Sequence, residues 1–496
     1  MIYITRENSS FLKLESDDES IIKTIKDAYM FDTPNFQFTK RYKLSNKKWN
    51  GKINLLKKNK YLYSGLRDNL KTFLNKLNYP YKDQYADNIL NVSISDIEDF
   101  IDILQLPFEP KDYQIKSVHA FINKQNMILV SPTASGKTLI LYIIICLLIK
   151  LKLVNKILII VPTISLVDQC YKNFLEYSQY NNKLNSFFQK QIHCVYSGEE
   201  KETNKLITFG TYQSMVLCQK EYISSFDFIG ADECHLMSKS SGQFIFESGI
   251  NTTFRFGMTG TLHETELDVL VLEGLIGQPL QFVKTMELMN RGDIANFQVN
   301  NILLQYSDAI KLKLFNKTYQ DEYNEIISNK NRMEYINNFI LNLNQNVLVL
   351  YTRIDKHGKL IYDSLNEKNV DKSIHFLSGR NEKEDRELVI ELAEKNNNLI
   401  MICSYGIFST GISIKNIHHI VFCSPYKSKF KVLQSIGRGL RLHESKDMCN
   451  IYDFIDDFRY NGKNNYLFEH FKNRYKIYKY EGFNLNNIVS DIIIKE

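Results

Sequence analysis

A segment in the first third of the chain has the residue types that bind phosphate. Residues 131–138 read SPTASGKT, between an apolar run that suits a strand and one that suits a buried helix. In such a loop, backbone N–H groups surround the phosphates, the lysine neutralises their charge, and the next hydroxyl can hold Mg²⁺. The candidate phosphate ligands are Pro132, Thr133, Ala134, Ser135, Gly136, Lys137 and Thr138. Because Ser131 replaces the glycine that normally begins this pattern, the prediction depends on the strand–loop–helix context.

Two adjacent carboxylates follow another apolar run, about ninety-five residues beyond the lysine. Asp232 and Glu233 end the run FDFIGADE, residues 226–233. At the end of a buried strand, one carboxylate can hold Mg²⁺ while the other orients and deprotonates a water. We assign the metal to Asp232 and the water to Glu233. Together with the loop, this pair predicts hydrolysis of a nucleoside triphosphate.

Three further groups fit the same chemistry, although each is a weak signal alone. Thr259 and Thr261, in a TGT, end another apolar run, and their hydroxyls could sense the state of the site. The side-chain amide of Gln114 could read an adenine edge through paired hydrogen bonds. Arg438 and Arg441 share one helical face, and an arginine aimed at the transferring phosphoryl group contributes roughly 10³–10⁵ in rate. The alternatives are a turn, a helix-surface residue and a solvated basic face.

A parallel sheet is needed to bring these segments together. Apolar runs alternate with helical patterns, which is typical of strands covered on both faces. The first series of expected strands covers residues 127–131, 156–162, 206–211, 226–233 and 253–260, and the second covers 346–353, 373–379, 398–405 and 419–425. We predict an α/β fold with two tandem parallel-sheet domains after a small α+β domain. The expected divisions are residues 1–95, 96–288, 289–457 and a basic, aromatic extension at 458–496.

The first of these regions carries a concentrated positive charge. Between residues 40 and 76 there are twelve Lys or Arg and one acid, a net of +11, whereas the whole chain carries +6. Such an excess indicates either a polyanion partner or a solvated basic face. The eight cysteines form no C-x-x-C pair, and the first residues have no signal-peptide pattern. We therefore expect a soluble, cytoplasmic protein with reduced cysteines and no membrane partner.

Seven segments, in this order and spacing, resemble the motif series of superfamily 2 helicases. They are SPTASGKT, VPTISLVDQ (161–169), ITFGTYQS (207–214), DECH (232–235), TGT (259–261), YGIFSTGISIKN (405–416) and QSIGRGLR (434–441). Within that superfamily, KILIIVPT (156–163), KSKFKVLQSIGRGLR (427–441) and WNGKINLL (49–56) are similar to the UvsW-like recombination helicases of bacteriophages. The match to the superfamily 2 motif series spans residues 110–445, and the joint pattern is specific.

The resemblance implies two RecA-like domains that close on ATP and Mg²⁺, and it implies a role for each motif residue. Gln114 would read adenine, Gly411 would contact ATP, and Gln434, Arg438 and Arg441 would join the catalytic set, with Arg441 as the finger. His235, Thr259 and Thr261 would couple hydrolysis to movement. The implied nucleic-acid contacts are Pro162, Thr163, Thr211, Gln213, Thr352 and Arg353, with Lys47, Lys48 and Lys52 in the basic N-terminal domain.

The implied activity is a 3′–5′ DNA helicase that branch-migrates junctions and remodels stalled forks and R-loops. Its partners would be branched DNA and RNA–DNA hybrids, with recombination and single-strand-binding proteins as candidate protein partners, and we expect a monomer. Four alternatives stay open: an RNA helicase, a transcript-release helicase, the motor of a restriction system, and a catalytically dead DNA-binding scaffold. Intact Lys137, Glu233 and Arg441 argue against the last.

Overall fold

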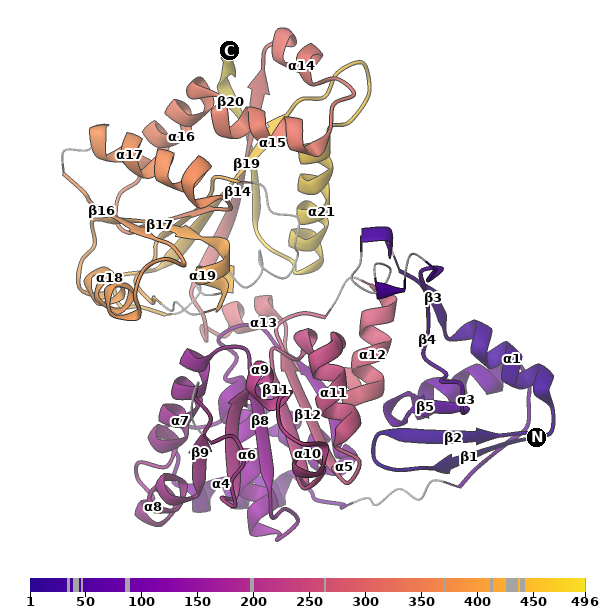
Figure 1. Cartoon of the computed structure of the whole chain (residues 1–496). Coiled ribbons are helices and arrows are strands. Elements are labelled where there is room, and N and C mark those ends of the chain that lie inside the picture. Colours follow the sequence, from indigo (N-terminus) through magenta and orange to yellow (C-terminus); the bar gives the residue numbers. More distant parts are fainter. Residues whose placement is uncertain are drawn as a thin grey trace. The chain divides into compact units, whose positions relative to one another are not determined.

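The chain folds into two compact units, which are described separately. The computed structural model describes all residues except 34–35, 39–43, 46–47, 85–89, 197–199, 263–264, 369–370, 411–413, 425–435, 438–441 and 496, and the side chains of 383, 409 and 410. One unit comprises Met1–Ser131 and Gly136–Phe282, and the other Pro132–Ser135 and Val283–Glu496. Figure 1 labels the elements of both.

The first unit begins with a small mixed sheet in the order β5-β2-β1-β6. Its elements are β1 (Ile2–Arg6), β2 (Phe11–Glu15), α1 (Glu19–Ala28), β5 (Tyr61–Tyr63), η2 (Ser64–Leu66), α3 (Arg67–Lys76) and β6 (Tyr81–Asp83), with a separate hairpin of β3 (Met30–Asp32) and β4 (Lys52–Asn54). Alternate residues of β1 are buried, namely Ile2 and Ile4. This period of two is what a sheet with one buried face requires, and the region is α+β as predicted.

The rest of the first unit is built on a seven-stranded sheet in which every pairing is parallel. Its order is β13-β7-β12-β11-β8-β10-β9. The strands are β7 (Asn126–Val130), β8 (Ile157–Val161), β9 (Ile192–Cys194), β10 (Ile207–Thr211), β11 (Phe228–Asp232), β12 (Phe254–Thr259) and β13 (Gln278–Leu280). The five predicted strands of this series are therefore confirmed.

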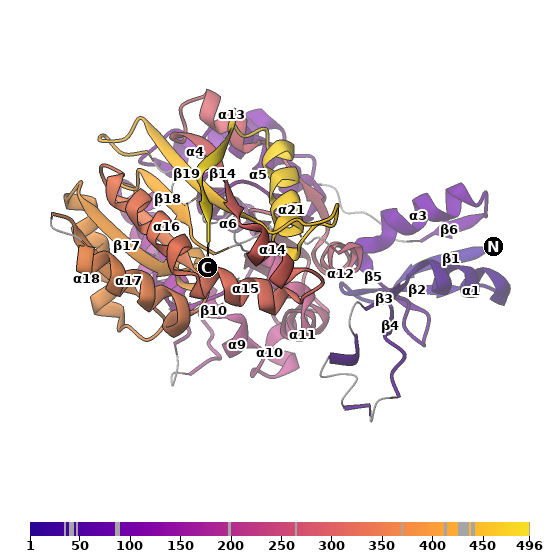
Figure 2. The same ribbon diagram turned by 90° about the horizontal axis from the view of Figure 1, so that it is seen from above.

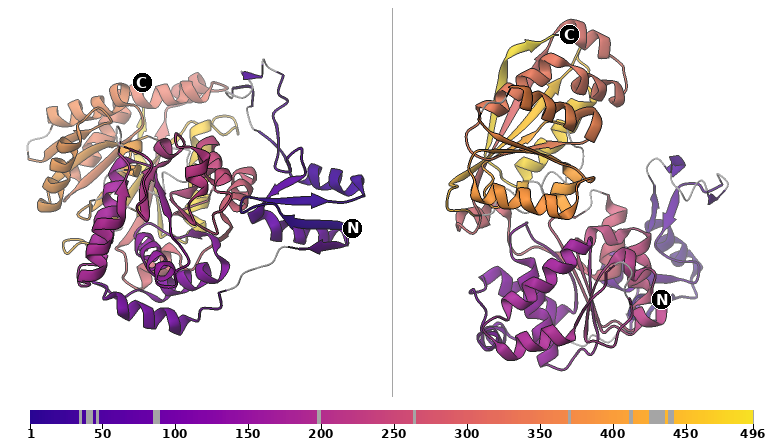
Figure 3. Two further views of the ribbon diagram at one scale, coloured as in Figure 1. Left: turned by 60° about the horizontal axis from the view of Figure 1, so that its bottom comes forward. Right: turned by 60° about the vertical axis from the view of Figure 1, so that its left-hand side comes forward.

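Helices cover both faces of this sheet, as Figure 3 shows. They are α4 (Ile94–Leu104), α5 (Asp112–Lys124), α6 (Lys137–Lys150), α7 (Ile164–Tyr177), α8 (Asn182–Gln191), α9 (Tyr212–Met215), α10 (Lys220–Ser224), α11 (Ser240–Ser248) and α12 (Glu266–Ile276). Met127 and Leu129 belong to one core, and Ile128 between them belongs to the other. Burial on both faces explains the continuous apolar runs of the sequence. Helix α6 is buried from Leu139 to Leu148, as its apolar run predicted.

The second unit contains a second seven-stranded parallel sheet, in the order β16-β17-β15-β18-β19-β14-β20. Its strands are β14 (Asn296–Tyr306), β15 (Val347–Tyr351), β16 (Ser373–Leu377), β17 (Leu399–Ser404), β18 (His419–Phe422), β19 (Met448–Asp457) and β20 (Leu485–Ile494). Strands β18, β19 and β14 run side by side in Figure 2. The four predicted strands of this series are confirmed.

Several helices accompany this sheet. They are α13 (Thr285–Asn290), α14 (Asp308–Leu314), α15 (Tyr319–Ser328), α16 (Lys330–Asn342), η4 (Ile354–Gly358), α17 (Lys359–Lys368), α18 (Lys383–Lys395), α19 (Tyr405–Thr410) and α21 (Tyr466–Tyr480). The segment 458–496, which we treat as an extension from its sequence, supplies α21 and the edge strand β20. Phe468 and Tyr478 of α21 are buried, whereas Tyr480 is exposed. Among the described residues, no helix is long and apolar enough to cross a membrane.

Candidate functional site

The motifs of the first unit gather along one edge of its sheet. The carboxyl ends of parallel strands meet at the same edge, where open α/β sheets bind their ligands. The sheet order places β7, β12 and β11 next to one another, followed by β8 and β10. The first three end at the phosphate loop, the TGT and the carboxylate pair, and the last two end at the predicted nucleic-acid contacts. We call the part of this edge with the predicted phosphate-binding residues the phosphate half, and the part with the predicted nucleic-acid contacts the nucleic-acid half.

In the phosphate half, hydrogen bonds and a close approach hold residues at both ends of the loop after β7. Gly136 has a φ of +76°, and a Cβ there would lie 2.3 Å from Nε2 of Gln114, so glycine is needed. The Lys137 ammonium donates to the Ser131 carbonyl at 3.1 Å, which keeps the charge at the mouth of the loop. Oε1 of Gln114 accepts from the Lys111 N–H at 2.8 Å. The predicted adenine-reading glutamine and phosphate-binding lysine therefore flank one loop.

A chain of polar contacts joins the carboxylate pair to the TGT segment. Glu233 has a φ of +49° and donates its backbone N–H to Asp232 Oδ1 at 2.9 Å. Its Oε2 lies 3.5 Å from His235 Nδ1, which in turn lies 3.3 Å from Thr259 Oγ1. The Thr259 hydroxyl donates to the Thr261 carbonyl at 2.7 Å.

The chain also reaches the phosphate loop, because the Ser131 N–H donates to the Thr259 carbonyl at 2.9 Å. His235 and Thr259 are buried, at 5% and 0% exposure. Contacts among buried polar groups therefore join Glu233 to Thr259 and the phosphate loop.

Oxygen ligands for a divalent metal are available beside this chain. Thr138 lies in the first turn of α6, directly after the lysine, and Asp232 is the last residue of β11. Mg²⁺ in phosphate sites takes one or two protein oxygens and fills its other positions with phosphate and water. A hydroxyl and a carboxylate meet that requirement.

In the nucleic-acid half, two threonines cap the helices that follow neighbouring strands. Val161 of β8 is paired in register with Thr211 of β10, so the segments after them start side by side. The Leu166 N–H donates to Thr163 Oγ1 at 3.4 Å, and the Ser214 N–H donates to Thr211 Oγ1 at 3.2 Å. Pro162 is buried, and Gln213 is exposed. The structure thus brings all four predicted contacts to one stretch of the edge.

The second unit repeats this arrangement at its own carboxyl edge. Tyr351 of β15 is paired with Ser404 of β17, so Thr352 and Tyr405 leave neighbouring strand ends. Arg353 lies over the Tyr323 ring at 4.7 Å and donates to Oε1 of Gln320 at 2.8 Å. Tyr323 also contacts the Thr352 hydroxyl. The predicted contacts Thr352 and Arg353 are therefore held by α15.

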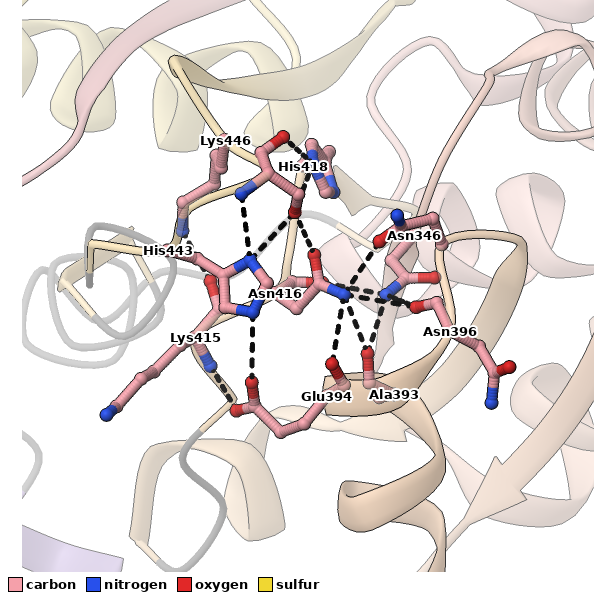
Figure 4. Close-up of polar contacts among 11 residues, drawn as sticks. Asn346, Ala393, Glu394, Asn396, Lys415, Asn416, His418, His443 and Lys446 are labelled. Atoms are coloured by element: carbon pink, nitrogen blue, oxygen red, sulfur yellow. Dashed lines mark hydrogen bonds and ion pairs between the residues drawn. The ribbon is translucent and has the colours of Figure 1, made fainter.

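At the opposite edge of this sheet, a buried polar cluster ties two crossovers together (Figure 4). The Asn346 side chain donates to the carbonyls of Ala393, Asn396 and Asn416, at 2.8, 2.6 and 2.9 Å. The Ser445 hydroxyl donates to Asn416 Oδ1 at 2.8 Å. Asn416 lies in the connection from β17 to β18, and Ser445 lies in the connection that leads into β19, so these two connections are fixed to each other.

Several predicted site residues lie outside the described residues. They are Gly411, Gln434, Arg438 and Arg441 of the second unit and Lys47 of the first. Lys48 and Lys52 are described, and both are exposed.

Part of the N-terminal charge excess is balanced within the fold. Lys60 pairs with Glu19 at 2.7 Å, Arg67 with Asp83 at 2.8 Å, and Lys57 with Glu247 at 2.8 Å. All three acids lie outside the stretch whose charge we counted. The net +11 therefore overstates the charge that a polyanion would meet, and Lys48 and Lys52 become the stronger candidates.

Comparison with known proteins identifies the family. The ATP-dependent DNA helicase uvsW of Enterobacteria phage T4 is 33% identical over 490 residues, covering 94% of this chain and 95% of that protein. The chain belongs to the UvsW family of superfamily 2 DNA helicases. It is therefore an ATP-dependent DNA helicase and an ATPase, as the motif series predicted.

Family models match three regions of this UvsW-family chain. Residues 2–82 match "DNA helicase UvsW, N-terminal", residues 107–264 match "Type III restriction enzyme, res subunit", and residues 331–443 match "Helicase conserved C-terminal domain". The crystal structure of T4 UvsW superposes with a TM-score of 0.51 at 29% identity, covering 99% of both chains. A putative HsdR subunit of a type I restriction enzyme from Vibrio vulnificus shares the fold, with a TM-score of 0.57 at 17% identity over 80% of this chain and 72% of that one.

Some residues of this helicase site leave no motif in the sequence. Tyr323 and Gln320 support Arg353 from about thirty residues upstream, in a helix that reads as ordinary amphipathic sequence. Asn346 and Asn416 are buried hydrogen-bonding residues, and asparagine is too common in this chain to mark them.

Proposed function

We propose that this UvsW-family chain is a 3′–5′ DNA helicase or translocase that unwinds or branch-migrates Holliday junctions, stalled forks and R-loops. The observation that carries the proposal is the polar chain from Glu233 through His235 to Thr259, with Thr259 bonded to the phosphate loop. A simple ATP-binding protein has no need for such a link. A helicase needs one, because the conformational change that accompanies hydrolysis must reach the protein segments that bind nucleic acid.

The site residues divide the chemistry as follows. Glu233 orients and deprotonates the attacking water, while Lys137 stabilises the charge that develops on the transferring phosphoryl group. Thr138 and Asp232 would hold Mg²⁺, which would supply further neutralisation of the phosphate charge. Gln114 reads the adenine edge. Arg441 is the proposed arginine finger, with Arg438, Gln434 and Gly411 as further nucleotide contacts.

Nucleic acid is contacted mainly through its phosphates. The first unit offers Thr163, Thr211 and Gln213 at the carboxyl edge of its sheet. The second unit offers Thr352 and Arg353 at the carboxyl edge of its own sheet. These residue types suit contacts with the nucleic-acid backbone, without reading of the bases. Lys48 and Lys52, with Lys47, would add affinity for duplex or junction DNA. Binding should therefore depend on salt and little on sequence.

A lysine pair on one helix gives a matched test of the hydrolysis site. Lys137 and Lys150 are the first and last residues of α6. We expect Lys137→Ala to abolish DNA-stimulated ATPase while DNA binding persists, and Lys150→Ala to change neither. Undiminished ATPase in the Lys137 variant would refute the site assignment.

The substrate is tested by comparing stimulation across DNA and RNA structures. We expect forked, four-way and R-loop substrates to be unwound, with loading on a 3′ single strand. An RNA helicase or a transcript-release helicase would instead show its strongest stimulation with RNA or with a transcription complex. A DNA-binding scaffold would bind DNA and release no phosphate.

A further inference from the structure

The N-terminal domain packs directly on the first helicase domain through a continuous apolar core. Leu62, Tyr63 and Leu66 share one cluster of buried side chains with Val271 and Leu275 of α12. Two glycines bring the backbones close at this contact. A Cβ on Gly65 would lie 2.0 Å from the Glu273 carbonyl oxygen, and a Cβ on Gly274 would lie 2.7 Å from Tyr63 Cβ. Such complementarity is that of a protein interior rather than of two tethered modules.

Buried polar groups fix the same contact. Ser10 lies in the turn between β1 and β2, is 0% exposed, and donates to the Phe246 carbonyl at 3.0 Å. The Arg255 guanidinium, 2% exposed, donates to Ser10 Oγ at 2.7 Å and to the Gly249 carbonyl at 2.8 Å. The Ser9 N–H donates to the Ile250 carbonyl at 2.9 Å. Separating the domains would leave these groups without their partners, which is costly for buried donors.

Glu247 adds a charged contact at the end of α11. Its Oε1 accepts from the Tyr63 hydroxyl at 2.6 Å and from the Lys57 ammonium at 2.8 Å. The Lys57 ammonium also lies 4.4 Å from the centre of the Phe11 ring. Glu247 and Lys57 are only 30% and 37% exposed, so this pair is more strongly coupled than a fully solvated one.

The elements on the helicase side of the contact are those that carry the hydrolysis motifs. Helix α11 follows the DECH segment through the short helix η3 (Cys234–Ser238). Gly242 of α11 packs on η3, since a Cβ there would lie 2.3 Å from Met237 Cα. Arg255 lies near the start of β12, the strand that ends at Thr259. Both sensing motifs are therefore continuous with residues that hold the N-terminal domain.

We propose that the N-terminal domain is a fixed part of the first helicase domain, and that Glu247 is a positioning residue that couples DNA held by the N-terminal domain to the hydrolysis motifs. The coupling rests on the proposed function, whereas the docking does not. The DNA contacts at Lys48 and Lys52 then move with the first helicase domain during each ATP cycle. Unwinding of branched DNA needs this coupling, and ATPase stimulated by a single strand does not.

Hydrogen exchange tests the docking without reference to activity. We expect the Ser9 amide to be strongly protected in the full chain and to lose protection in Gly274→Ala. Alanine is intrinsically more favourable than glycine in a helix, by roughly 1 kcal/mol. A loss of protection would therefore come from the clash of the added methyl group with Tyr63 and not from a weaker helix. A Ser9 amide that exchanges freely in the unaltered chain would overturn the docking.

A charge swap tests the coupling. We expect Glu247→Lys to slow unwinding of forked DNA by about tenfold while single-strand-stimulated ATPase changes by less than about twofold, because only the coupled step uses the pair. The double variant Lys57→Glu, Glu247→Lys should recover most of the unwinding, which a merely damaged fold would not do. Glu221→Lys, at an exposed position on α10, is the matched control.

The outcomes separate the two proposals. Normal unwinding by Glu247→Lys, or failure of the swap to rescue it, would overturn the coupling. A chain without any DNA-stimulated ATPase would overturn the proposed function and the coupling together. The exchange result would then still decide whether the N-terminal domain is docked.

Discussion

Arg353 shows how a predicted nucleic-acid contact depends on residues that no motif contains. The Tyr323 ring supports its guanidinium, and Gln320 accepts one of its N–H groups. A cation over an aromatic ring is worth ~0.5–1 kcal/mol at a partly exposed site. These contacts hold the charge in place before nucleic acid arrives, so less side-chain freedom is lost on binding.

We expect Tyr323→Leu to weaken single-strand binding by about two- to fivefold, the equivalent of that ring contact. Tyr323→Phe keeps the ring and should bind nearly normally, although it loses the contact with Thr352. Fluorescence anisotropy at fixed salt is the measurement, with Arg353→Ala as the reference for complete loss. Equal affinities for Tyr323→Leu and the unaltered chain would show that the ring does not support this contact.

His357 provides a second residue-scale prediction, on acid stability. It is 3% exposed in η4 and lies 2.8 Å from Ser424 Oγ through Nδ1. Burial, and secondarily the positive charge of Arg332, lowers its pKa from 6.5 to about 3. Between these values the unfolded chain binds a proton that the folded chain excludes. Folding stability therefore falls as pH drops below 6.5, by about 1.4 kcal/mol per pH unit for this one group.

Replacing His357 by glutamine should flatten that dependence. The side chain no longer titrates, so the midpoint of urea unfolding should fall less steeply between pH 6.5 and pH 4 than in the unaltered chain. His419, whose pKa burial lowers to about 4, still contributes to the slope in both proteins. Parallel slopes for the two proteins would contradict the assignment to His357.

Among the elements, α21 is attached to β19 by a buried ion pair. The Arg474 guanidinium makes two hydrogen bonds of 2.8 Å to the Asp453 carboxylate, which also accepts from the Tyr478 hydroxyl at 3.0 Å. Arg474 and Asp453 are 1% and 0% exposed. Removing one partner of such a pair leaves the other charge buried, which costs about 3–5 kcal/mol.

Asp453→Asn should therefore lower the free energy of unfolding of the second unit by an amount in that range. The double variant with Arg474→Met removes both charges, and we expect it to be more stable than the single variant. Chemical denaturation followed by circular dichroism gives both values. A single variant as stable as the unaltered chain would mean that the pair is not what holds α21.

The comparison of sequence with structure is also best made at the scale of elements. The central strands were predictable because parallel strands buried on both faces leave apolar runs such as ILIIV at 157–161. Strand β20 was not, because it lies at an edge and reads LNNIVSDIII, with several side chains exposed. The order of the strands, and hence the neighbourhood of Thr259 and Asp232, comes from tertiary pairing that spacing alone does not encode.

In the candidate site, the residues that form motifs were predictable from the sequence and the residues that support them were not. Lys137, Glu233 and Thr259 carry motifs because the chemistry restricts those positions to few residue types. Supporting residues such as Tyr323 and Glu247 are restricted only by shape and by one or two hydrogen bonds. Many sequences meet those conditions, so only the fold reveals them.

At the scale of the whole molecule, ion pairs within the fold change which lysines of the N-terminal domain are candidates for contact with DNA. Lys57, Lys60 and Arg67 are paired with acids, whereas Lys48 and Lys52 are exposed, and Lys52 is the first residue of β4. The phosphate contacts of the N-terminal domain should therefore depend on fewer lysines than the composition suggests. The proposed phosphate contacts of the helicase domains are separate from these lysines, so the two contributions should separate when substrates with and without a junction are compared.

The salt dependence of DNA affinity measures the two contributions separately. Each phosphate contact contributes about 0.9 to the slope of log affinity against log salt on duplex DNA. We expect Lys48→Ala with Lys52→Ala to reduce the slope for forked DNA by about 2 while leaving the single-strand slope unchanged. The control is Lys150→Ala with Lys152→Ala, which removes the same charge from exposed positions at the far end of α6 from the phosphate loop. If both pairs changed the slopes equally, the effect would come from net charge, and the N-terminal lysines would not be contacts. A reduced slope for the first pair alone would place junction DNA on the N-terminal domain, because net charge cannot distinguish one pair of lysines from the other.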